Sequence, residues 1–517
     1  MTYAIACGHS VTAQAAEETL RAGGTAVDAS IAAALAAMVA EPVLAGLLGG
    51  GFLMVREPGG KAHVLDAFVQ TPSHKLPDGD IALDVVTADF GTTTQDFHIG
   101  PGSIAVPGLA KGLTEAHARF GRMSLSDLAS PAIKAAREGV TVTAYQAQLA
   151  NIVKPILMAT PGATALHCDG DVLKAEGDLL RNPDLGEVLE VFAHEGHRFV
   201  TEGEIAQSLL ALTDQGGQVT ADDLKRYEPV WRKPLVQQRG SARISMNPPP
   251  ALGGALIAFT LQMLGNKPDM VDVAHALEAT GKARLEADLL RDPMAGSQRL
   301  LNPDLLQRYR DEILRRKAST RGTTHISIID ADGMGAALTL SNGEGCGHIL
   351  PGTGIMPNNM LGEDDLLPDG MQSWTRGKRL SSMMTPMAVD WPYGRFAMLG
   401  SGGSNRIRSA LAQVLVHLLD HDSHLTDAIE APRLHVEQGI DPEGRTIQIV
   451  DAEPPAQEQD RAALLATWPD TRIWDEPSMF FGGVHAVRGN DQGRRDAAGD
   501  PRRSGIALTG YSVSGNT

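Results

Sequence analysis

The sequence predicts a globular α/β protein, and three observations carry this prediction. Of its 517 residues, 43% are hydrophobic and 21% are charged, a balance typical of globular proteins. Residues 13–20 and 27–40 have the composition of helices and end at a Gly-Gly pair and a Glu-Pro pair. Residues 322–342 are typical of a β-hairpin, because two strand-like runs flank an Asp-Ala-Asp-Gly turn.

The N-terminal helices lead into a glycine-rich strand. The second helix is too short and too interrupted to span a bilayer, which needs about 20 apolar residues, so we expect no membrane contact. Residues 49–51 are three successive glycines before the apolar run 52–55. They lack the spacing of a phosphate-binding loop, and close backbone packing explains them better.

A capped helix is predicted immediately before the hairpin. Asn302 and Pro303 have the residue types of a helix start, and a basic cluster at residues 315–317 is typical of a helix end. The Ser/Thr-rich connector 318–322 follows, and such connectors tolerate a chain break. The basic cluster is best interpreted as a solvated helix end.

The hairpin places polar groups together at its open end. A β-branched run from Ile326 to Ile329 forms the first strand, and residues 336–340 return as the second. If the turn is centred near Asp332, the register brings Ser341 and Asn342 to within about one step of Thr323. This convergence predicts a site.

Composition excludes several classes of function. The net charge of −17 argues against a nucleic-acid partner, because a polyanion requires a basic surface. Three cysteines are too few for a disulfide framework or a four-ligand zinc site, and they suit a reducing compartment. The N-terminus lacks the features of a secretory signal, so we expect a cytoplasmic protein. A homo-oligomer is compatible with the sequence.

Thr323 can act as a nucleophile only if a base removes its proton. The nearest base would be its own α-amine, which exists only after the bond between Gly322 and Thr323 is cut. Gly322 has no side chain to obstruct attack of the Thr323 hydroxyl on the preceding carbonyl, so an N-to-O acyl shift could make that cut. The alternative is that the hydroxyls of this strand are ordinary polar residues on one face.

Several motifs resemble the γ-glutamyltransferase family of self-cleaving N-terminal nucleophile hydrolases, and the likeness runs almost from end to end. The resemblance implies a four-layer αββα fold, made as one precursor and cut into a large subunit, residues 1–322, and a small subunit, residues 323–517. The motifs are Thr323-Thr324-His325-x-Ser327 with Asp332-Gly333, residues 378–383, residues 400–404 and residues 500–505.

The resemblance also implies the site residues. Thr323 would be the nucleophile, with Ser341 and Asn342 orienting it. The Gly402 and Gly403 amides would form the oxyanion hole, and amides at the start of a helix suit that role. Substrate would be bound by the residues that align with the family's binding positions, which are Glu363, Ser381 and Ser382.

One position departs from the family pattern. The family uses an arginine to bind the α-carboxylate of a γ-glutamyl group, and Phe68 stands there in this sequence. Phenylalanine cannot replace two charge-assisted hydrogen bonds. Either another cation replaces the arginine, or the substrate is not γ-glutamyl. The candidate cations are Arg379, Arg406 and Arg408.

Three functional hypotheses therefore stand. The first is hydrolysis of γ-glutamyl amides such as glutathione, with transfer to water or an amine acceptor. The second is hydrolysis of a smaller amide such as oxamate. The third is an inert binding or structural homologue. This hypothesis is disfavoured by the presence of the predicted catalytic residues, which are Thr323, Ser341, Asn342 and the Gly402-Gly403 pair.

A metal site and a cofactor are not expected. His417 and His421 have the four-residue spacing of a two-histidine metal site. No glutamate follows His417 as in a metalloprotease helix, and histidines gather at helix C-termini because of the helix dipole.

Overall fold

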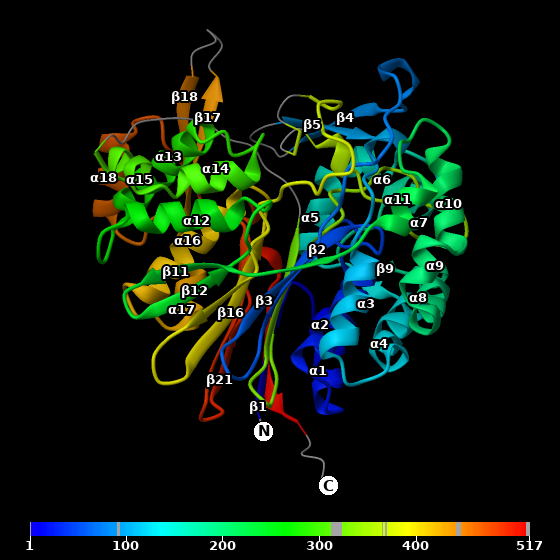
Figure 1. Ribbon diagram of the computed structural model, residues 1–517, viewed down its shortest axis with the longest axis horizontal. Helices are drawn as coiled ribbons and strands as arrows, with labels where there is room; N and C mark the ends of the chain where they lie inside the picture. Colours follow the sequence, from blue (N-terminus) through cyan, green and yellow to red (C-terminus); the bar gives the residue numbers. More distant parts are fainter. Residues whose placement is uncertain are drawn as a thin grey trace.

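The computed structural model describes residues 2–89, 94–311, 323–363, 366–367, 370–440 and 446–512. Two β-sheets pack face to face, and helices cover the outer face of each (Figure 1). This is the αββα arrangement, so the predicted fold class is confirmed. No helix within the described ranges combines the length and the apolar character needed to cross a membrane.

The first sheet contains the predicted hairpin at its centre. Its described strands, in spatial order, are β10 (Val230–Arg232), β3 (Ala62–Ala67), β2 (Gly50–Arg56), β14 (Gly335–Ser341), β13 (Thr324–Ile329), β1 (Thr2–Cys7) and β22 (Ile506–Tyr511). The hairpin prediction is confirmed, because β13 pairs with β14 from Thr324 opposite Leu340 to Ile329 opposite Gly335. The next step of this register places Thr323 beside Ser341.

The second sheet faces the first across a layer of apolar side chains that includes Met54, Ile329 and Met398. Its described strands, in spatial order, are β11 (Leu235–Arg239), β12 (Ala242–Met246), β15 (Met387–Asp390), β16 (Arg395–Gly402), β20 (Gly483–Asn490) and β21 (Arg495–Ala498). β13 contacts both β16 and β20. The strand that follows Thr323 therefore lies in the centre of the core.

Two helical layers close the structure. The layer outside the first sheet contains α1 (Ser10–Arg21), α2 (Ala26–Ala40), α3 (Leu109–Phe120), α4 (Leu125–Glu138), α5 (Ala144–Ile152), α8 (Pro183–Glu195), α9 (His197–Thr201) and α10 (Glu204–Thr213). The layer outside the second contains α12 (Gly253–Met263), α13 (Met270–Glu286), α14 (Pro293–Leu300), α15 (Pro303–Asp311), α16 (Arg406–Leu419), α17 (Leu425–Glu430) and α18 (Glu458–Thr467).

Shorter elements complete the described structure. They are α6 (Lys154–Leu157), α7 (Pro161–His167), α11 (Ala221–Arg226), β4 (Asp84–Asp89), β5 (Thr94–Ile99), β6 (Val140–Thr141), β7 (Cys168–Asp169), β8 (Val172–Leu173) and β9 (Leu179–Leu180). A separate three-stranded sheet consists of β17 (Leu434–Ile440), β18 (Thr446–Ala452) and β19 (Arg472–Ile473), and β17 contacts α13 and α16. The helix predicted before the hairpin is α15, whose described part ends at Asp311. The connector 318–322, including Gly322, lies outside the described residues.

The buried helix α2 supports the hairpin from outside. Every one of its residues is buried, and its alanines allow close approach to β13 and β14. Thr25 caps the helix through a reciprocal pair of hydrogen bonds with Asp28. The Asp330 carboxylate of the hairpin turn accepts hydrogen bonds from the backbone amides of Ala26 and Met334. The hairpin is thus attached to the helix start as well as to its neighbouring strands.

Candidate active site

A pocket of about 490 Å³, including its mouth, lies at the open end of the hairpin. Thr323 precedes β13, and Ser341 ends β14, so the hairpin register brings both into the pocket. Glu363, Ser381 and Ser382 also line it, and all five of these residues are buried. The structure therefore brings together five of the residues predicted for the site from widely separated parts of the sequence.

The remaining wall of the pocket is largely apolar. The start of α16 contributes Ser404, Asn405 and Ile407. The apolar lining residues are Phe68, Leu252, Met360, Leu366, Met383, Met384 and Ile407. No arginine or lysine is among the described residues that line this pocket.

The predicted oxyanion glycines lie between Thr323 and helix α16. Gly402 ends β16 opposite Gly483, and Gly403 has φ of 119°, which favours glycine. A Cβ atom on Gly402 would lie 2.0 Å from the Thr323 carbonyl oxygen, so the two backbones are in close contact. Gly403 is followed by Ser404, which lines the pocket. Side chains at either glycine would separate the loop from its neighbours.

Asn342 is placed differently from Ser341. Its side-chain amide donates to the Met356 carbonyl oxygen at 3.0 Å. Its Oδ1 faces Gly46, where an added Cβ would lie 2.7 Å away. Asn342 is buried but is absent from the described lining of the pocket. Its contacts hold the loop that follows β14, and its role toward Thr323 stays a prediction.

The three candidate replacement cations do not reach the pocket. Arg379 lies behind Phe68: its Nη1 donates to the Phe68 carbonyl oxygen at 2.6 Å, and its Nε lies 3.4 Å from Asp66. Arg406 stacks on the Phe480 ring, and the buried Arg408 donates to the Val436 carbonyl oxygen. None of the three belongs to the described lining of the pocket.

Glu41 is a buried acid that the sequence analysis treated only as a helix stop. Its Oε1 accepts a hydrogen bond from Thr324 Oγ1 at 3.1 Å, one residue after the predicted nucleophile Thr323. Burial raises the pKa of Glu41 to about 7, although the Thr324 hydrogen bond and the positive charge of Arg503 oppose this shift. A carboxyl group with a pKa near 7 therefore lies beside the start of β13.

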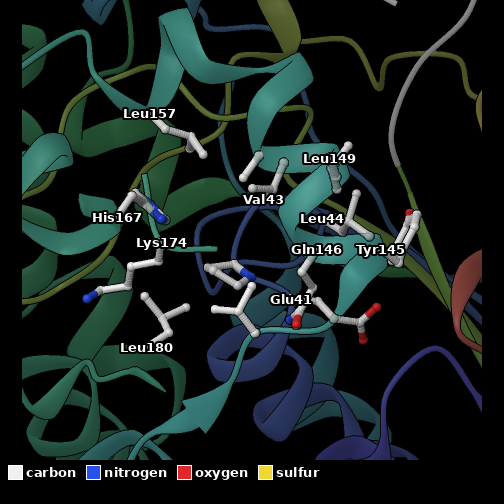
Figure 2. Close-up of a pocket in the computed structure, with 13 residues that line it drawn as sticks. Glu41, Val43, Leu44, Tyr145, Gln146, Leu149, Leu157, His167, Lys174 and Leu180 are labelled. Atoms are coloured by element: carbon white, nitrogen blue, oxygen red, sulfur yellow. The ribbon is translucent and has the colours of Figure 1, made fainter. Parts of the chain in front are cut away.

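Glu41 also borders a second pocket behind this strand. Figure 2 shows Glu41, Gln146 and Tyr145 on one side of it and His167 and Lys174 on the other. Most of its other lining residues are aliphatic, which is consistent with the desolvation of Glu41. The apolar surroundings that raise the pKa of Glu41 form only in the folded chain, and no residue next to Glu41 in the sequence predicts them.

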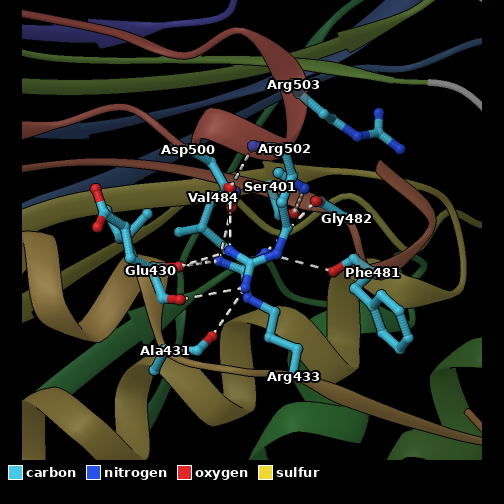
Figure 3. A network of polar contacts seen from close by, with 12 residues as sticks. Ser401, Glu430, Ala431, Arg433, Phe481, Gly482, Val484, Asp500, Arg502 and Arg503 are labelled. Carbon is cyan, nitrogen blue, oxygen red and sulfur yellow. Dashed lines mark hydrogen bonds and ion pairs between the residues drawn. The ribbon is translucent and has the colours of Figure 1, made fainter. Parts of the chain in front are cut away.

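A buried ionic network holds β20, the strand that pairs with Gly402 (Figure 3). Asp500 pairs with Arg433 at 2.7 Å and with Arg502 at 3.2 Å, and it accepts a hydrogen bond from the Val484 amide at 2.8 Å. Burial alone would raise the pKa of Asp500, but the two guanidinium groups lower it. Nη1 of Arg433 also contacts the carbonyl oxygen of Gly482 at 3.4 Å. The start of β20 is thereby fixed beside Gly402.

Within the described ranges, no group of three His, Cys, Asp or Glu side chains could hold a metal ion. The His417 and His421 rings are 5.6 Å apart, and burial lowers the pKa of His417 to about 4. All three cysteines are buried free thiols.

Comparison with known proteins agrees with the fold. The Acylase ACY 1 proenzyme of Pseudomonas sp. (strain V22) is 30% identical over 98% of this chain and 93% of its own length. The Glutathione hydrolase proenzyme of Bacillus subtilis (strain 168) is 26% identical over 83% of this chain and 80% of its own length. Cephalosporin acylase from Bacillus halodurans shares the fold, with a TM-score of 0.81 at 22% identity over 98% of this chain and 95% of that chain. Because the Gamma-glutamyltranspeptidase sequence profile also matches residues 12–510, the chain belongs to the gamma-glutamyltranspeptidase family of enzymes.

Proposed function

We propose that the protein is a self-processing amide hydrolase in which Thr323 is the nucleophile. The Thr323 hydroxyl would first attack the Gly322 carbonyl carbon, and hydrolysis of the resulting ester would release a large subunit, residues 1–322, and a small subunit, residues 323–517. The shared lining of one pocket by Thr323, Ser341 and Glu363 supports this proposal.

The freed amine of Thr323 would serve as the base in turnover. It accepts the proton of Thr323 Oγ while Oγ attacks the amide carbonyl carbon of the substrate. The Gly402 and Gly403 amides stabilise the resulting oxyanion. Collapse breaks the C–N bond, the leaving amine takes up the proton, and an ester on Thr323 remains. Water, or an amine acceptor, then removes the acyl group and restores the hydroxyl.

The acyl half of the substrate is proposed to be mainly apolar with one polar end. The observation that carries this choice is Phe68 in the pocket wall with Arg379 bonded behind it. A free α-carboxylate would have to be buried there without a described cation, which is costly. Ser381, Ser382 and Glu363 line the same pocket and would bind the polar end of the acyl group.

Hydrolysis of γ-glutamyl amides such as glutathione is the second candidate. Glu363 favours it, because a carboxylate in the pocket can bind the α-amine of a γ-glutamyl group. Oxamate hydrolysis is the third candidate, and oxamate would leave most of the apolar wall of the pocket, such as Phe68 and Met360, without a substrate contact.

Two measurements test these proposals. Mass spectrometry of the purified protein is expected to show two polypeptides, with the smaller one beginning at Thr323. Thr323→Ala is expected to remain a single chain without amidase activity, whereas Thr323→Ser, which keeps a hydroxyl, is expected to be processed slowly. An active enzyme that remains one uncut chain would overturn the nucleophile assignment.

A substrate panel distinguishes the acyl groups. Anilides of butyric, hexanoic and 6-hydroxyhexanoic acids are compared with γ-glutamyl anilide, glutathione and oxamate. Faster release from the acyl anilides supports the proposed acyl specificity. Faster release from γ-glutamyl anilide and glutathione would instead establish γ-glutamyl hydrolysis, and ammonia release from oxamate alone would establish oxamate hydrolysis.

A further inference from the structure

Arg503 connects the nucleophile to the oxyanion glycines. Its Nη1 donates to the Thr323 carbonyl oxygen at 3.2 Å, across 180 residues of sequence. Its Nη2 donates to the Met479 carbonyl oxygen, also at 3.2 Å. Both acceptors are backbone atoms, so the guanidinium joins the first residue of the proposed small subunit to the loop before β20.

The same guanidinium packs against the proposed oxyanion loop. A Cβ atom on Gly402 would lie 3.0 Å from Nη1, and one on Gly403 would lie 3.1 Å from Nη2. A Cβ atom on Gly483, the cross-strand partner of Gly402, would lie 2.5 Å from Cδ of Arg503. The arginine side chain therefore lies directly against all three glycines. Only residues without a side chain allow this contact.

The turn that carries Arg503 is rigidly held. Asp500 accepts a hydrogen bond from the Arg502 amide and starts the 3₁₀ turn Pro501–Arg503. Figure 3 shows Arg502 pointing into the ionic network of Arg433 and Asp500, whereas the Arg503 side chain points away from it. The network thus fixes the backbone from which Arg503 extends.

We propose that Arg503 is a positioning residue that keeps the Thr323 peptide in register with the Gly402-Gly403 amides. The inference rests on the proposed function. The planar guanidinium binds two carbonyl groups at once, which a lysine ammonium on its flexible stem cannot reproduce. When Thr323 becomes an N-terminal residue, its carbonyl remains anchored, so its amine and hydroxyl project from a fixed peptide plane.

The test compares Arg503→Met and Arg503→Lys with Arg495→Met. Arg495 also donates to backbone carbonyls, those of Asn490, Arg494 and Asp330, but it lies at the far end of the sheet, at the hairpin turn. For Arg503→Met we expect kcat to fall by about 100-fold, as for loss of an oxyanion donor, with KM nearly unchanged because Arg503 does not line the substrate pocket. Arg503→Lys should lose less, and Arg495→Met should keep wild-type kcat.

Chemical rescue separates positioning from folding. Arg503 also lines a cavity with Glu344, Trp474 and Phe480, so Arg503→Ala would leave a space that a small cation can enter. Added guanidinium chloride, at a non-denaturing concentration, is expected to raise the kcat of Arg503→Ala but not that of wild type. The proposal would be overturned if folded Arg503→Met kept the wild-type kcat. It would also be overturned if circular dichroism showed that unfolded protein accounts for the whole loss of kcat in Arg503→Met.

Failure of the proposed function gives a different result. If wild-type protein neither cuts itself nor hydrolyses any amide of the panel, the catalytic assignment falls. Amide hydrogen exchange of residues 323–329 and 400–406 would then still test whether Arg503 holds these two segments together. Faster exchange in both segments of Arg503→Met, but not of Arg495→Met, supports the register role, and unchanged exchange overturns it.

Discussion

Replacing Glu41 with glutamine should remove a pH dependence from the stability of the fold. The carboxyl group is buried, and its pKa rises from the ordinary value of 4.5 to about 7. A carboxyl with a raised pKa in the folded state stabilises the fold fully below its unfolded pKa, and this contribution is lost as pH rises through the folded value. Glutamine keeps the shape of the side chain but cannot ionise.

The structure gives the magnitude. The difference between 7 and 4.5 corresponds to about 3 kcal/mol, at about 1.4 kcal/mol per pKa unit. Between about pH 5.5 and pH 8.5, wild type should therefore lose about 2 kcal/mol of free energy of unfolding relative to Glu41→Gln. The rest of this free-energy difference is lost at pH values below 5.5, where the Glu41 carboxyl of the unfolded chain itself begins to take up a proton.

The assay is urea unfolding followed by tryptophan fluorescence at a series of pH values. The quantity compared is the difference in free energy of unfolding between Glu41→Gln and wild type, because other titrating groups cancel in it. Glu187→Gln, on the exposed face of α8, is the control and should show a constant difference. A constant difference for Glu41→Gln as well would refute the reasoning, because Glu41 would then not be protonated in the fold.

Two further predictions concern the surroundings of the nucleophile. Thr324→Val removes the hydroxyl that donates to Glu41, so the pKa of Glu41 should rise further. The urea series should then place the loss of stability at a higher pH than in wild type. An unchanged pH midpoint of this loss would contradict the prediction. Asp500→Asn leaves two buried guanidinium groups with one fewer carboxylate, and urea unfolding should show a loss of about 3–5 kcal/mol. A loss below about 1 kcal/mol, as for exposed ion pairs, would mean that the network is not buried as described.

Local chemistry made the hairpin predictable. The β-branched run and the Asp-Gly turn are encoded by neighbouring residues, and they fix the register that places Thr323 beside Ser341. The other lining residues, such as Glu363 and Ser382, came from the family resemblance, because they reach the pocket from distant segments. No pattern of spacing alone would have joined them.

Contacts between distant segments could not be predicted. Arg503 was visible only as part of a motif, and its bond to Thr323 depends on how β20 and the final 3₁₀ turn pack. Arg379 was a candidate substrate cation, but the fold satisfies its guanidinium with backbone carbonyls behind Phe68. The pKa of Glu41 follows from burial, which is a property of the assembled layers.

The pairing of β1 with β22 has a practical consequence. Thr2 and Tyr511 are direct partners across these strands, so the two described ends of the chain lie side by side (Figure 1). A short linker could join them, and the gene could then be opened before Thr323. Such a circular permutant would begin, after removal of the initiator methionine, with the threonine already exposed, and it would separate the chemistry of maturation from the chemistry of turnover.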